Sequence, residues 1–110
     1  MFGSLFSRAP NPSDVDLDTL ARAVGAGEVT VVDVREPNEF AAGHIPGAVS
    51  LPLSRFDPKK LPNGKPVVLI CQAGGRSRNA LNQVHAAGRK DVKHYPGGMS
   101  QWRANGGDVA

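Results

Sequence analysis

The chain has 110 residues, 40% of them hydrophobic and 21% charged, which is the composition of one ordinary globular domain. Its single cysteine excludes an internal disulfide and the cysteine-based structural zinc sites. The net charge of +3 favours anionic partners, but the chain lacks the basic segments interleaved with aromatic residues that indicate nucleic-acid binding. No apolar stretch is long enough to span a bilayer, so we expect neither a nucleic acid nor a membrane as a partner.

The first segment, residues 1–12, lacks the basic start and the sustained apolar middle of a signal peptide. We predict a flexible N-terminal arm over residues 1–12, which ends in a turn at Asn11-Pro12, and one domain over residues 13–110. With no signal peptide and a single thiol, a reducing cytoplasm is the expected compartment.

Helical and strand patterns alternate through this domain. A helical stripe runs from Leu17 to Val24, with Asp16 as its N-cap and Gly25 as its terminator. The elements that follow are predicted, in chain order, as a buried strand at 29–34, a short helix at 37–40, a short strand at 48–51, a surface connection at 52–66, the strongest strand at 67–71, a helix at 76–87, a strand at 92–95 and a final short helix containing Met99 and Trp102. This alternation predicts an α/β fold with a mainly parallel sheet.

Ligands of parallel sheets bind at the carboxyl ends of the strands, where two groups of polar residues fall. Asp33 and Arg35 end the first strong strand, and two interpretations remain open for them. They either border a pocket or form an ion pair that fixes the following turn, and we favour the ion pair. The three histidines have no metal-ligand spacing, so no metal site is predicted, and we assign His44 to a turn rather than to a base for Cys71.

Cys71 ends the strongest strand, where a cysteine is ordinarily an inert buried side chain. The residues after it favour chemistry instead. Gly74 and Gly75 allow positive φ angles that bring several N–H groups to one point, and Ser77 is predicted to cap the next helix. Arg76 adds a positive charge. A thiol in this environment should have a lowered pKa and lie beside a cradle for an anion.

Residues 71–77 (Cys-Gln-Ala-Gly-Gly-Arg-Ser) resemble the active-site loop of the rhodanese-like sulfurtransferases. Residues 31–40 and 43–48 resemble the first signature of that family, and residues 95–106 resemble its closing signature. The resemblance implies a three-layer α/β fold with a mainly parallel five-stranded sheet flanked by helices. It also implies sulfane-sulfur transfer as the reaction.

The resemblance further implies roles for single residues. Cys71 would be the catalytic nucleophile that attacks the outer sulfur of thiosulfate, releases sulfite and holds a persulfide, which cyanide or a thiol then discharges. Arg76 would pair with the oxyanion end of the small anionic donor. The substrate-binding residues would be Gln72, Ala73, Gly74, Gly75, Arg76 and Ser77. No general base, metal or organic cofactor is implied.

Three alternatives to this enzyme are compatible with a single reactive cysteine. A persulfide carrier or interaction module would receive sulfur at Cys71 from a partner protein and have little activity on thiosulfate. A cysteine-based phosphatase is disfavoured, because only four residues separate Cys71 from Arg76, one fewer than in those enzymes. A redox sensor is disfavoured because the chain has no resolving cysteine.

Overall fold

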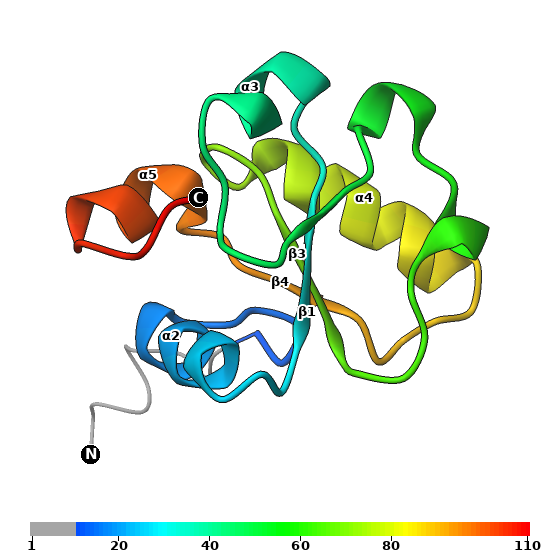
Figure 1. Cartoon of the computed structure of the whole chain (residues 1–110). Helices are drawn as coiled ribbons and strands as arrows, with labels where there is room; N and C mark the ends of the chain where they lie inside the picture. The colour runs from blue at the N-terminus through cyan, green and yellow to red at the C-terminus, as the bar shows by residue number, and fades with distance from the viewer. Residues whose placement is uncertain (1–10) are drawn as a thin grey trace, which may run out of the picture.

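The computed structural model describes residues 11–110, which form a parallel sheet covered by helices on both faces (Figure 1). The strand order is β2-β1-β3-β4. The central strands β1 (Thr30–Asp33) and β3 (Val67–Ile70) pair along their whole length, from Thr30 opposite Val67 to Asp33 opposite Ile70. The outer strands β2 (Val49–Ser50) and β4 (Lys93–His94) are short.

The helices lie close to the positions that the sequence predicts. Asp16 caps α2 (Leu17–Gly25), since its side chain accepts a hydrogen bond from the Thr19 amide at 2.8 Å. The other helices are α3 (Pro37–Ala41), α4 (Gly75–Ala86) and α5 (Gly98–Ala104), and the surface connection contains two short 3₁₀ turns, η1 (Leu53–Arg55) and η2 (Pro58–Lys60). None of the helices within residues 11–110 is long and apolar enough to cross a membrane.

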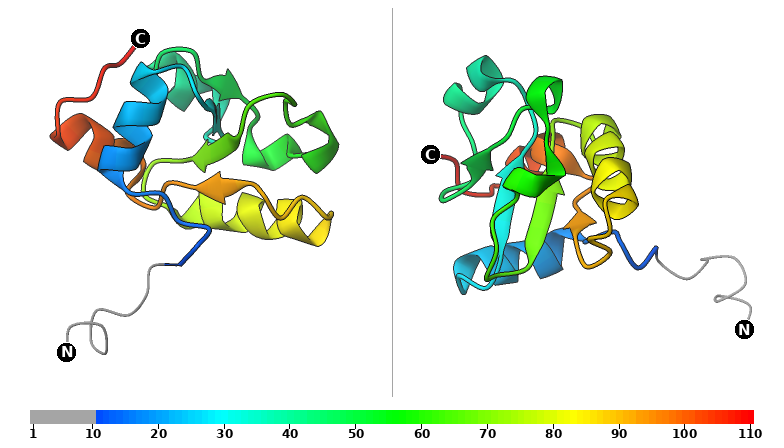
Figure 2. Two further views of the ribbon diagram at one scale, coloured as in Figure 1. Left: turned by 90° about the horizontal axis from the view of Figure 1, so that it is seen from below. Right: turned by 90° about the vertical axis from the view of Figure 1, so that its right-hand side faces the viewer.

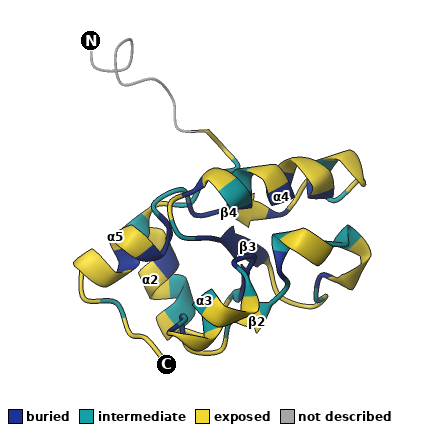
Figure 3. Ribbon diagram, turned by 90° about the horizontal axis from the view of Figure 1, so that it is seen from above, coloured by how far each residue is buried: buried dark blue, intermediate teal, exposed yellow. Residues whose placement is uncertain are grey.

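Two hydrophobic clusters make the structure three-layered, with the sheet between helices (Figure 2). Helix α4 packs on one face, and α2 and α5 pack on the other. The first cluster contains Val32, Val34, Leu61, Val67, Leu69, Cys71, Ala80, Leu81, Val84 and Val92. The second contains Leu20, Val31, Ile45, Val68, Ile70, Tyr95, Met99 and Trp102. Strand β3 is therefore buried on both sides, which fits its continuous apolar sequence (Figure 3).

The prediction of five strands is wrong, because the sheet in residues 11–110 has four. Beside β4, Asp14 and His94 form an isolated parallel bridge, in which the Val15 amide donates to the His94 carbonyl at 2.9 Å. The chain therefore enters the domain where a fifth strand would lie. A turn closed by the Asp14 amide on the Asn11 carbonyl precedes this bridge and α2 follows it, so one residue pair is all that fits.

The turn at Asn11-Pro12 agrees with the sequence prediction. The remainder of the predicted N-terminal arm, residues 1–10, lies outside the described residues.

Candidate active site

Cys71 follows β3 directly, at the carboxyl end of a central strand and just before α4. The backbone turns round its sulfur. The Gly74 amide donates to Sγ at 3.1 Å and the Ser77 amide at 3.2 Å, while the Ser77 hydroxyl oxygen lies 3.5 Å from Sγ. The loop of residues 71–77 is thus a cradle of N–H groups with the sulfur at its centre, as its sequence predicts.

Opposing effects set the charge of this sulfur. Burial raises the pKa of the Cys71 thiol, since the residue is only 1% exposed. The Ser77 hydroxyl and the amides of Ser77, Ala73 and Gly74 lower the pKa, and together they outweigh burial. The net pKa lies below the ordinary thiol value, so Cys71 has the character of a reactive cysteine.

The two loop glycines are not equivalent. Gly74 has a φ of +99°, and a Cβ atom there would lie 2.6 Å from the Pro96 carbonyl oxygen. Gly75 has no positive φ and open space around it, and it begins α4. The prediction that both glycines supply positive φ angles therefore holds for Gly74 alone.

Ser77 does not cap α4, contrary to the sequence prediction. The helix begins at Gly75 with Gly74 as its N-cap, which places Ser77 inside the first turn. There its side chain is fully buried and faces the sulfur of Cys71. Because Ser77 lies three residues past the N-cap, its hydroxyl is free to contact the sulfur of Cys71.

The start of α5 supports the loop from the C-terminal part of the chain. The Met99 amide donates to the Cys71 carbonyl at 2.9 Å, and the Ser100 amide donates to the Gln72 carbonyl at 3.1 Å. Gly98 has a φ of +63°, and any Cβ atom there would collide with the Gln72 carbonyl oxygen. The glycine pair of the closing segment is explained in part by this close approach of two backbones.

The guanidinium of Arg76 is already paired with a carboxylate. Its two terminal nitrogens donate to the two carboxylate oxygens of Glu39 in α3, at 2.6 and 2.9 Å. The Arg76 hydrogen bonds lower the pKa of Glu39 from 4.5 to about 2, so the carboxylate stays charged. The sequence pattern did not single out Glu39, although this residue lies within the first signature segment.

Asp33 and Arg35 form a buried, two-pronged ion pair with a shortest distance of 2.7 Å. Arg35 also donates to the Gly43 carbonyl at 2.8 Å, which ties the end of β1 to the turn after α3. The hydrogen bonds of both side chains go to each other, to the Arg35 backbone and to Gly43. This is the turn-fixing network that we favour from the sequence.

His94 is the second residue contacting the loop of residues 71–77 that the sequence pattern did not single out. It is 1% exposed, and its Nδ1 lies 2.8 Å from the Ser77 hydroxyl oxygen. The contact joins residues 17 positions apart, so no local sequence pattern could predict it.

Within residues 11–110, no group of three or more His, Cys, Asp or Glu side chains is placed to hold a metal ion.

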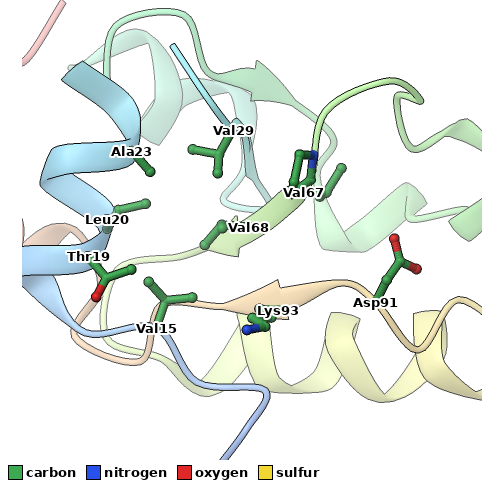
Figure 4. Close-up of a pocket in the computed structure, with 10 residues that line it drawn as sticks. Val15, Thr19, Leu20, Ala23, Val29, Val67, Val68, Asp91 and Lys93 are labelled. Atoms are coloured by element: carbon green, nitrogen blue, oxygen red, sulfur yellow. The ribbon is translucent and has the colours of Figure 1, made fainter. Parts of the chain in front are cut away.

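An apolar pocket lies elsewhere in the molecule, between α2 and the sheet (Figure 4). It is lined by Val15, Thr19, Leu20, Ala23, Val29, Pro66, Val67, Val68, Asp91 and Lys93. Val67 begins β3 and Cys71 follows its end, so this pocket opens near the amino end of the strand rather than at the loop.

Comparison with known proteins gives one consistent result. The sequence profile of the family described as "Rhodanese-like domain" matches residues 16–105. An uncharacterized protein of Synechocystis is 50% identical over 80 residues, which are 71% of this chain and 45% of that protein. The thiosulfate:glutathione sulfurtransferase of Saccharomyces cerevisiae is 29% identical over an alignment of 122 positions, which covers 93% of this chain and 88% of the yeast protein.

Solved structures agree with the sequence comparison. The human single-domain sulfurtransferase TSTD1 superimposes with a TM-score of 0.73 at 26% identity, over 86% of this chain and 97% of the human chain. The chain spans about half the length of some of the curated relatives that it matches, among them the Synechocystis protein.

Proposed function

The chain belongs to the rhodanese-like family, and from this premise we propose that it transfers sulfane sulfur from thiosulfate, or a related donor, to a thiophilic acceptor through a persulfide on Cys71. Membership of this family and its sulfurtransferase relatives support sulfur transfer in general. The observation that carries the assignment to Cys71 is the pair of amide hydrogen bonds, from Gly74 and Ser77, that converge on its sulfur.

The proposed reaction has two displacement steps. The Cys71 thiolate attacks the outer sulfur of thiosulfate, the new S–S bond forms, and sulfite leaves with the electron pair of the bond that breaks. An acceptor such as cyanide or a thiolate then attacks the outer sulfur of the persulfide and regenerates the Cys71 thiolate. The amides that stabilise the thiolate also favour it as the leaving group in the second step.

The proposed acceptor lies outside the chain, because a second thiol is lacking. This chain contains one cysteine, so the persulfide cannot be discharged onto an internal partner. The name of the yeast relative specifies glutathione for that protein, which supports a thiol as one candidate acceptor here.

A persulfide carrier is the second candidate, and the Arg76–Glu39 pair is the observation that favours it. The guanidinium that would bind an anionic donor is already neutralised by a carboxylate at 2.6 Å. A partner protein that presents a neutral persulfide would not need this guanidinium. The donor would then be a protein rather than thiosulfate.

Intact-protein mass spectrometry tests the proposal. We expect incubation with thiosulfate to add the mass of one sulfur atom, cyanide to remove it, and Cys71→Ser to show no gain. A gain that appears only with a cysteine desulfurase and its substrate would assign the carrier role. No gain under either condition would contradict sulfur transfer at Cys71.

A further inference from the structure

A string of buried polar side chains leads from the catalytic sulfur to the edge of the sheet. The sulfur of Cys71 lies 3.5 Å from the Ser77 hydroxyl oxygen, and that oxygen lies 2.8 Å from Nδ1 of His94. On the other side of the ring, Nε2 of His94 lies 3.2 Å from an oxygen of Asp14. The string joins the loop after β3, helix α4, strand β4 and the segment before α2.

The middle of this string is closed to solvent. Ser77 is fully buried and His94 is 1% exposed, so neither polar group can exchange its partners for bulk water. The Ser77 hydroxyl has one hydrogen and two neighbouring acceptors, the Gly74 carbonyl at 3.2 Å and the His94 ring at 2.8 Å. The shorter contact favours donation to His94, which leaves the serine oxygen free to accept from the thiol.

Three charged or ionisable groups face His94. Asp14 attracts a protonated ring, Arg78 on α4 repels it while holding Asp14 at 3.0 Å, and Cys71 faces it through Ser77. Burial and Arg78 lower the pKa of His94, while Asp14 opposes them only in part. The ring is therefore neutral near neutral pH, and its Nδ1 can accept a proton. The Nε2 contact with Asp14 is close but is not an aligned hydrogen bond.

We propose that His94 is a positioning residue that acts through Ser77 to ionise Cys71. The thiol S–H bond breaks and its proton passes to the Ser77 oxygen, while the Ser77 hydroxyl proton passes to Nδ1 of His94. The result is a thiolate, an unchanged serine that now donates to the sulfur, and an imidazolium that Asp14 stabilises. No proton is gained or lost overall. The sulfur of Cys71 belongs to a residue that is only 1% exposed, and the relay provides it with a proton acceptor inside the protein.

The proposal rests on the proposed function only in taking Cys71 as the nucleophile. Its test does not use sulfur transfer, so the two can fail separately. The rate of alkylation of the full chain by iodoacetamide, measured against pH, reports the thiolate of Cys71. This cysteine is the only one in the chain.

His94→Asn removes the proton acceptor but keeps an amide that can hydrogen-bond to Ser77. We expect alkylation near neutral pH to slow by about tenfold and the midpoint of the pH curve to rise by about one unit. Ser77→Ala should have the same effect. The double variant should lose no more alkylation rate than either single variant, because both changes interrupt the same proton relay. His85→Gln, a histidine outside the string, should leave the curve unchanged.

Asp14→Asn gives a test that spares the buried residues, and it separates the relay from simple electrostatics by the sign of its effect. Removal of a nearby negative charge should by itself favour the thiolate and lower the midpoint. The relay predicts a raised midpoint, because the imidazolium loses its counter-ion. A lowered or unchanged midpoint for Asp14→Asn, or additive losses in the double variant, would overturn the proposal.

Discussion

Arg76 lies five residues after Cys71, and both of its terminal nitrogens hold Glu39, at 2.6 and 2.9 Å. The small anionic donor proposed above would have to share the guanidinium with this carboxylate or displace it. The pair is about one-third exposed, so its strength is moderate and exchange is accessible. At the scale of single residues, we therefore expect Glu39 to limit how well the proposed site takes an anion.

The variant Glu39→Gln should improve the use of thiosulfate. The freed guanidinium is expected to lower the KM for thiosulfate by up to about fivefold, since an ion pair that is about one-third exposed contributes on the order of 1 kcal/mol or less. Steady-state kinetics with cyanide as acceptor measure this, and kcat should change little. Glu36→Gln is the matched control, because Glu36 binds Ser54 rather than Arg76. A raised KM in Glu39→Gln would show instead that Glu39 holds Arg76 in its productive position.

The loop and the first turn of α4 form one structural unit in which only one glycine of the pair is required. Gly74→Ala should destabilise the fold by about 2 kcal/mol or more, because alanine tolerates its φ poorly and its Cβ would press on the Pro96 carbonyl. Gly75→Ala should be neutral or stabilise by up to about 1 kcal/mol, since it lies in ordinary helical conformation with open space around it. Urea denaturation of the two variants checks this, and equal losses would contradict it.

Most of the helices and strands could be predicted from the sequence, because the patterns that indicate them are local. The cap at Asp16, the continuous apolar run of β3 and the glycines of the loop act through their immediate neighbours. The roles of Glu39 and His94 could not be predicted in this way. They meet the loop only after segments 37 and 17 residues away have packed against it. The prediction of a fifth strand was wrong for a similar reason. A turn before this segment and a helix cap after it leave only one residue of Ser13-Asp14-Val15 to pair with β4.

At the scale of the whole molecule, the α3–α4 ion pair adds a pH-dependent contribution to stability. The pKa of Glu39 falls from 4.5 in the unfolded chain to about 2 in the folded one. A lowered folded-state pKa means that the contribution is complete above pH 4.5 and is lost as the pH falls toward about 2. The thermal midpoints of the native protein and Glu39→Gln should therefore converge over this interval. A constant difference between them would contradict the assigned pKa.

The parallel order of the sheet has a consequence for how this protein folds. Every paired strand in it is joined by a crossover, so even the central pair β1 and β3 must close a long loop of chain before it gains a contact. The amide of Met99, near the C-terminal end, completes the support of the Cys71 carbonyl. The support of Cys71 is therefore complete only after Met99 has joined the fold, and we expect its thiol to acquire the lowered pKa only when nearly the whole domain has been synthesised.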